Sequence, residues 1–168
     1  KVLREGINMR DASESDVQRA MSRLDKLNNS NGGENVADLR KELQNTMQNY
    51  FGVFRDGPFM QEGINKLAGL RARIENAQLS DKSKAYNTAR IEALELHNLF
   101  EVAEATAITA EARKESRGAH ARNDFDSRDD ENWLCHSLYF PTEKRVGKRA
   151  VNFEPKTVAT FKPTARNY

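Results

Sequence analysis

The sequence predicts a mainly α-helical protein, an antiparallel bundle of three to four helices with a small C-terminal appendage of extended or β-hairpin structure. Three observations predict this fold class. Before Lys114, apolar residues recur at steps of three and four, the period of an amphipathic helix. Short loops rich in Asn, Gly, Ser and Pro separate these stretches, which favours antiparallel neighbours. After Ser116 this period is lost, and two short strand-like runs follow.

The first helix is predicted to begin after Ser13, because Asp16 three residues later completes a variant of the capping box. Its apolar stripe is Val17, Ala20, Met21, Leu24 and Leu27. Residues 28–33 are predicted as a loop, since Asn and Gly readily adopt left-handed backbone conformations. The second helix should then begin near Asn35 or Val36.

The second and third helices show the same periodicity. The second stripe is Val36, Leu39, Leu43, Met47 and Tyr50. A break follows at Gly52 and at Asp56-Gly57-Pro58, where Asp56 is predicted to cap the third helix and Pro58 suits its first turn. The predicted buried face of the third helix is Met60, Ile64, Leu67, Leu70 and Ile74.

The fourth helix is predicted to run from about Lys84 to Lys114, after a loop at Ser80 and Asp81. Its later half, Val102–Ala112, is rich in Ala and Thr. These small side chains would let a neighbouring helix or sheet approach closely.

The remainder of the chain has a different character, which predicts a division into a helical bundle, residues 1–115, and a second part, residues 116–168. The second part would comprise a charged linker loop, short strands at Trp133–Phe140 and Val146–Phe153, and a basic tail. Pro141 and Gly147 bracket the connection between the strands. Lys156–Tyr168 is predicted to be extended.

Charge and composition exclude several classes of function. The net charge of +2 is too small to indicate nucleic-acid binding. The basic excess lies in residues 144–168, with seven basic and one acidic side chain, and predicts either a solvated tail or docking on an acidic protein surface. No apolar run approaches the roughly 20 residues that span a bilayer, so no direct membrane insertion is expected.

The first ten residues and the single cysteine lead to two further expectations, one about processing of the chain and one about disulfides. Lys1–Arg10 lacks an initiator Met and an apolar signal core, so we expect a fragment or a processed product, with tag removal as the alternative. Cys135 has no second cysteine with which to form an internal disulfide.

No catalytic, cofactor-binding or metal-binding residue is predicted in this chain. The dinucleotide, phosphate-loop, zinc-protease and nucleophile-elbow motifs do not occur. His97 lies in the fourth helix and is interpreted as structural. His120 and Asp124 would share a metal only if they were helical, and Gly118 argues against a helix there. Cys135 and His136 are neighbours in a predicted strand and should point to opposite faces.

The most unusual segment is 115–133, in which arginines alternate with acidic residues. Arginine can fork onto a carboxylate with two hydrogen bonds, so we predict a structural clamp with Asp124, Asp129 and Asp130 as acceptors. A solvated charged loop is the alternative. The predicted structural signature is Arg117, Gly118, His120, Arg122, Asp124, Arg128, Asp129, Asp130 and Trp133.

This signature resembles a known family. Glu115–His120, Arg122, Asp124 and Arg128–Leu134 resemble the C-terminal signature of succinate dehydrogenase and fumarate reductase flavoproteins. Cys135–Pro141 and Asn152–Lys156 are similar to proteobacterial succinate dehydrogenase in particular, and Phe51–Gly57 and Asn87–Phe100 also match. Asp126 departs from the pattern, because the family usually has Pro after the aromatic residue that follows the aspartate.

The resemblance implies a function for the whole subunit. It would oxidise succinate to fumarate with FAD, a step of the tricarboxylic acid cycle, and pass electrons through an iron–sulfur subunit to quinone. The catalytic and FAD-binding residues of the family precede Lys1, so the chain alone should be inactive and hold no cofactor. The resemblance thus implies a structural or assembly role for the chain itself.

The resemblance also implies partners and a location. The implied partners are the subunit's own flavin-binding domain and the iron–sulfur subunit. The implied location is the cytoplasmic face of the bacterial inner membrane, reached peripherally through the complex.

Two other functions compete with this interpretation. The chain would be a stand-alone helical adaptor if it bound a partner protein through residues 144–168. A nucleic-acid-binding module is disfavoured because the predicted bundle is net acidic. A longer gene with a Gly-rich flavin motif near its start would favour the flavoprotein over both.

Overall fold

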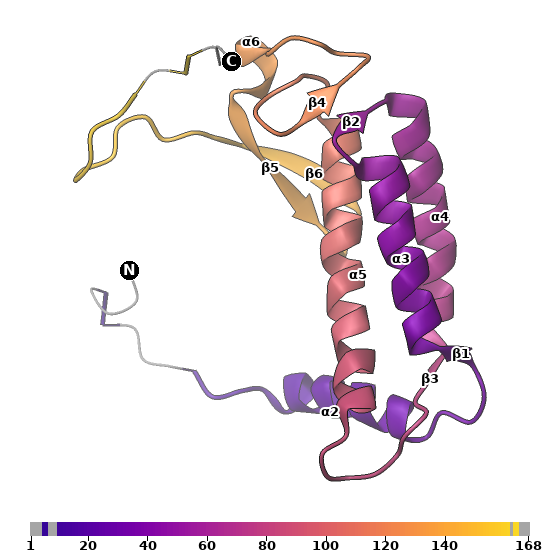
Figure 1. Cartoon of the computed structure of the whole chain (residues 1–168). Helices are drawn as coiled ribbons and strands as arrows, with labels where there is room; N and C mark the ends of the chain where they lie inside the picture. Colours follow the sequence, from indigo (N-terminus) through magenta and orange to yellow (C-terminus); the bar gives the residue numbers. More distant parts are fainter. Residues whose placement is uncertain (1–4, 7–9, 162, 165–168) are drawn as a thin grey trace. The chain divides into compact units, whose positions relative to one another are not determined.

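The computed structural model of the chain describes residues 5–6, 10–161 and 163–164 (Figure 1). Helices predominate in these residues, as the sequence predicts, and the strands are short. Parts of the leading stretch Lys1–Arg10 and of the predicted tail Lys156–Tyr168 lie outside the described residues.

The chain divides into two compact units. The first comprises Lys1–Glu42 and Leu70–Leu99, and the second comprises Leu43–Gly69 and Phe100–Tyr168. The boundary predicted between residues 115 and 116 rests on composition rather than on contacts, and it stays a prediction.

Helix α2 (Glu14–Asn28) begins as predicted, since the Ser13 hydroxyl accepts a 3.2 Å hydrogen bond from the backbone N–H of Asp16. Its apolar stripe does not become a buried face: Val17 and Met21 are 43% and 48% exposed. Leu27 is the buried residue of this helix and packs in the cluster formed with Leu79 and Ala93. The helix therefore joins the core of its unit only near its C-terminal end.

The loop after α2 contains the predicted left-handed glycines. Gly33 has a φ of +139°, and a Cβ there would overlap the backbone carbonyl of Asn76. This close approach permits strand β1 (Glu34–Asn35) to pair in parallel with β3 (Ala77–Gln78). Arg73 reinforces the pairing with ion pairs to Glu34 and Glu42, at 2.5 Å and 2.7 Å.

Helix α3 (Val36–Phe51) begins at the predicted residue, and helix α4 (Gly57–Glu75) begins with Pro58 in its first turn. Helix α3 buries two residues of its predicted stripe, Leu39 and Leu43, and leaves Val36, Met47 and Tyr50 half-buried, whereas α4 buries most of its stripe. In α4 the buried apolar residues are Met60, Leu67, Leu70 and Ile74. The two helices approach closely at Gly63, where an added Cβ would lie 2.6 Å from the Phe51 ring. The short strand β2 (Phe54–Arg55) connects them.

Helix α5 (Thr88–Ala112) is shorter than the predicted Lys84–Lys114. Asn87 accepts a 2.7 Å hydrogen bond from the N–H of Arg90, and its amide donates to the carbonyls of Asp81 and Ser83. These bonds fix a non-helical turn before Thr88, which is why the helix starts later than predicted.

The second unit also contains the remaining short elements. Strand β4 (Ala121–Arg122) pairs in parallel with β2, and α6 (Asp130–Trp133) is a single turn of helix. Strands β5 (Cys135–Phe140) and β6 (Arg145–Ala150) pair antiparallel, with Cys135 opposite Ala150 and Phe140 opposite Arg145 (Figure 1).

The strand boundaries differ from the predicted ones in two ways. Trp133 belongs to α6 rather than to the first strand. The second strand, β6, ends at Ala150 rather than at the predicted Phe153. Gly147 lies inside it opposite Leu138, and a Cβ there would lie 3.0 Å from the Phe140 ring. Among the described residues, no helix combines the length and the apolar character that crossing a membrane requires.

Candidate functional site

The charged segment after α5 is organised around Glu115, whose side chain is 0% exposed. Its carboxylate accepts hydrogen bonds from Arg113 at 2.5 Å, from Arg117 at 2.8 Å and from the backbone N–H of Asp129 at 2.9 Å. Burial raises the pKa of Glu115, but these hydrogen bonds together outweigh burial and lower the pKa below its usual value. Glu115 is thus a buried anion that connects three points of the segment.

Arg122 holds the C-terminal end of α5. Its side chain is 0% exposed, and Nη1 donates to the backbone carbonyls of Ala110, Glu111 and Arg113 at 3.0–3.4 Å. The last carbonyls of a helix lack intrahelical partners and carry partial negative charge, so a guanidinium group is a suitable cap for them. The Nε and Nη2 atoms of Arg122 form a two-pronged pair with Asp124, with both distances 2.6 Å.

Asp124 holds the N-terminal end of α4. Its Oδ2 accepts a 3.0 Å hydrogen bond from the N–H of Gly57, the first residue of that helix. The sequence predicts Asp56 as this cap, but Asp56 contributes its backbone carbonyl to Met60 instead. Its hydrogen bonds from Arg122 and then from Gly57 lower the pKa of Asp124 to about 2. The Arg122–Asp124 pair therefore fastens the end of α5 to the start of α4.

His120 links the segment to β2. Its Nδ1 lies 2.7 Å from Nη1 of Arg55, and its Nε2 lies 3.1 Å from the backbone carbonyl of Arg113. Because a guanidinium group only donates, Nδ1 must accept and Nε2 must carry the proton, which makes the ring neutral. Burial, followed by the charges of three nearby arginines, lowers the pKa of His120, although the hydrogen bond to the Arg113 carbonyl opposes this.

Arg117, Asp130 and Arg128 form an outer ion-pair chain. Arg117 lies 2.6 Å from Asp130, and Arg128 lies 2.9 Å from the other oxygen of the same carboxylate. Gly118, with a φ of +59°, permits a tight turn closed by two backbone hydrogen bonds between Arg117 and His120, at 2.8 Å and 3.0 Å.

Asp129 and Trp133 define the short helix α6. The Asp129 carboxylate accepts hydrogen bonds from the backbone and side-chain N–H groups of Asn132, both at 2.9 Å, and so caps α6. The sequence predicts instead that this carboxylate accepts two hydrogen bonds from an arginine. The Trp133 ring is contacted by two cations, Arg113 at 5.2 Å and Lys148 at 3.7 Å from its centre.

The structure thus brings most of the predicted signature into one connected network. Sequence reasoning did not single out Glu115, Arg113 or Arg55 as members of it. Glu115 begins the matching motif, so its place beside Arg117 was a usable signal. Arg55 is 65 residues from His120, and no local pattern marks their contact.

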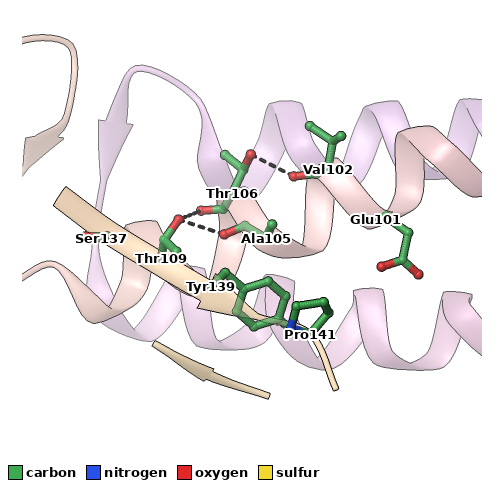
Figure 2. Close-up of a pocket in the computed structure, with 8 residues that line it drawn as sticks. All are labelled: Glu101, Val102, Ala105, Thr106, Thr109, Ser137, Tyr139 and Pro141. Atoms are coloured by element: carbon green, nitrogen blue, oxygen red, sulfur yellow. Dashed lines mark hydrogen bonds between the residues drawn. The ribbon is translucent and has the colours of Figure 1, made fainter. Parts of the chain in front are cut away.

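No group of three potential metal ligands occurs in the part of the chain that the structure describes. An open pocket of about 480 Å³ lies between α5 and β5 (Figure 2). The hydroxyls of Thr106 and Thr109 that line it are bonded to the carbonyls of Val102 and Ala105, at 2.8 Å and 2.7 Å. Their hydroxyl hydrogens are therefore committed to the helix backbone.

Comparison with known proteins identifies the family. The model of the family described as fumarate reductase flavoprotein C-term matches residues 40–168. The chain belongs to this family. Among its flavoprotein relatives, the succinate dehydrogenase flavoprotein subunit of Coxiella burnetii is 42% identical over 99% of the chain and 28% of the relative. That of Rickettsia bellii is 40% identical over 89% of the chain and 25% of the relative. The chain therefore spans only about a quarter of the length of these flavoproteins.

Solved structures agree with this family assignment. The chain resembles a quinol fumarate reductase of E. coli with a TM-score of 0.77 and 36% identity, over 91% of the chain and 27% of that protein. Adenylylsulfate reductase from Archaeoglobus fulgidus has a TM-score of 0.72 at 19% identity over 95% of the chain and 28% of that protein, which shows a shared fold.

Proposed function

We propose that the chain is the C-terminal region of a succinate dehydrogenase flavoprotein subunit and that its role there is structural. The observation that carries the proposal is the 42% identity to such a subunit along 99% of the chain. The match of the flavoprotein C-terminal family to residues 40–168 supports it independently of any single relative.

The contacts of the charged segment support a structural role. Arg122 is engaged by helix carbonyls and by Asp124, and Asp124 in turn caps α4. Both ring nitrogens of His120 are in hydrogen bonds within the segment and to Arg55. These side chains hold backbone ends in place, as expected of a clamp, and we propose that the clamp also supports the flavin-binding domain of the same subunit.

The activity of the whole subunit follows as part of the proposal. It would oxidise succinate to fumarate, with FAD and the catalytic residues supplied by the flavin-binding domain rather than by this chain. Electrons would pass to an iron–sulfur subunit and then to quinone. The complex would place the chain peripherally at the cytoplasmic face of the inner membrane.

The finer architecture is also proposed. We propose that α3, α4 and α5 pack as an antiparallel bundle and that β5 and β6 form a hairpin appendage to it. In the whole subunit, residues 1–115 would act as the helical part and residues 116–168 as the clamp, the strands and the basic tail. The stand-alone adaptor is not favoured, because the curated relatives are flavoprotein subunits.

The experiment that tests this role replaces Arg122 by Met in the complete flavoprotein subunit. We expect a lower yield of FAD-containing subunit and less co-purified iron–sulfur subunit, with the succinate oxidation rate per bound FAD unchanged. The matched control is Arg23→Gln, which removes one positive charge from an exposed position of α2. A parent-like yield of assembled complex would contradict the structural role, and a lower rate per bound FAD would indicate a catalytic one.

A further inference from the structure

Arg55 differs from the other arginines of the network in its partners. Its Nε donates to the backbone carbonyl of Gly52 at 3.1 Å, and its Nη1 donates to Nδ1 of His120 at 2.7 Å. These two bonds fix the guanidinium plane. They leave one N–H of Nη1 and both N–H groups of Nη2 without a hydrogen bond to any described residue.

The positive charge of Arg55 is also not neutralised. Arg113 is paired with Glu115, and Arg122 is paired with Asp124. Within residues 10–161, Arg55 has no carboxylate at ion-pair distance. Burial, and then the charge of Arg122, lower the pKa of Arg55, as expected for a cation that is partly desolvated beside another cation.

Arg55 is one of the residues that line an open groove of about 350 Å³ in the second unit. None of the residues that line it carries a carboxylate, and two of them, Arg55 and Arg113, are arginines. The lining residues are Arg55, Thr106, Thr109, Ala110, Arg113, His120, Cys135, His136 and Ser137. A concave surface that gathers cationic groups and lacks acidic ones concentrates anions.

We propose that this groove is a carboxylate-binding site and that Arg55 is the residue that contacts the carboxylate. Nη2 keeps two N–H groups and Nη1 keeps one, and guanidinium N–H groups are the donors that pair with carboxylate oxygens. His120 is a positioning residue, because its Nδ1 holds Arg55 in this orientation. The site does not depend on the proposed structural role of the chain.

The test titrates the 168-residue chain with acetate and with malonate, and follows backbone amide shifts by NMR. We expect saturable shifts confined to residues around Arg55, His120 and Ser137. Sodium chloride at equal ionic strength should not reproduce them. Arg55→Gln should weaken malonate binding about tenfold or more, since it removes a charge-assisted two-pronged pair. Arg23→Gln, the same charge change on exposed α2, should leave binding unchanged.

Two further variants guard against a folding artefact. Arg55→Lys keeps the charge but lacks the fork, and it should bind malonate several-fold more weakly than the parent while retaining the helical circular dichroism signal. His120→Gln should weaken binding less than Arg55→Gln does. Equal malonate affinity in the parent and in a folded Arg55→Gln or Arg55→Lys chain would overturn the proposal, as would equal shifts with chloride.

The complete subunit then distinguishes the source of the carboxylate. The readout there is confined to groove residues, because malonate resembles succinate and would also occupy the proposed succinate site. If a free small carboxylate is the ligand, the malonate-induced shifts at Arg55, His120 and Ser137 persist and still depend on Arg55. If an acidic side chain of the longer polypeptide fills the groove, these shifts are lost, and Arg55→Gln lowers the melting temperature more than it does in the 168-residue chain. These readouts involve neither FAD content nor assembly, so the site and the proposed function can fail separately.

Discussion

Single side chains in this protein hold backbone groups that lie far away in the sequence. Asp124 illustrates the principle, because one of its oxygens accepts from Gly57, 67 residues earlier, and both accept from the buried Arg122. Neutralising Asp124 would therefore uncap α4 and also leave the Arg122 charge without its counter-ion. A buried charge that loses its partner costs more than an exposed pair contributes.

The first prediction is that Asp124→Asn lowers the free energy of unfolding by about 2 kcal/mol at neutral pH, because Arg122 is left uncompensated. The pKa of Asp124 is about 2 in the folded chain against an ordinary 3.8, so the unfolded chain takes up the proton first. The stabilisation is therefore present above pH 3.8 and is lost as the pH falls towards 2. Urea unfolding at several pH values measures both effects.

The control for this prediction is Asp38→Asn, at an exposed position of α3. It should change stability by no more than a few tenths of a kcal/mol. If Asp124→Asn behaved like the control at neutral pH, Asp124 would be a solvated loop residue rather than part of a clamp.

The second prediction concerns Glu115, the buried carboxylate shared by Arg113 and Arg117. Glu115→Gln keeps the shape but removes the charge, and we expect a loss of about 3 kcal/mol. Thermal melts beside the exposed α5 control Glu92→Gln would measure it. Indistinguishable melts for the two variants would show that Glu115 does not hold the segment.

At the scale of secondary-structure elements, local signals locate the helices but do not always locate their ends. The start of α2 at Ser13 is a local capping interaction and was predicted. The start of α5 is also set by a local interaction, the hydrogen bond from the N–H of Arg90 to Asn87, yet it lies four residues after the predicted start at Lys84. The ends held by Asp124 and Arg122 depend on residues from another element.

The third prediction uses two glycines of α4 that have opposite surroundings. A Cβ added at Gly69 would meet no heavy atom within 4 Å. Gly69→Ala should therefore raise the free energy of unfolding by about 0.5–1 kcal/mol, because alanine has the higher helix propensity. Gly63→Ala would place its Cβ 2.6 Å from the Phe51 ring, so it should destabilise by about 1–3 kcal/mol. Thermal melts of both variants test the packing of α3 against α4, and stabilisation by Gly63→Ala would refute it.

At the scale of the whole molecule, the chain spans about a quarter of its flavoprotein relatives, 28% in the case of the Coxiella burnetii subunit. The apolar stripe of α2 is exposed at Val17 and Met21. The period of a helix indicates which face is apolar, but it does not indicate whether another element covers that face.

The fourth prediction is that the 168-residue chain alone binds no FAD and oxidises no succinate, because the resemblance implies that the flavin-linking and substrate-binding residues of the family lie in its flavin and capping domains. Its visible absorbance spectrum should lack a flavin band, and an artificial electron acceptor should stay oxidised when succinate is added. A yellow preparation, or succinate-dependent reduction of the acceptor, would refute this prediction.

The sequence by itself determined the helical fold class, the positions of α3 and α4, the Ser13 cap and the family. Each of these depends on residues that are close together in the chain, where backbone geometry imposes a period or a motif. Only the tertiary structure decided that Asp124 caps α4, that Glu115 is a buried anion and that His120 holds Arg55. Those contacts join residues up to 67 positions apart, and neither periodicity nor capping rules act over that separation.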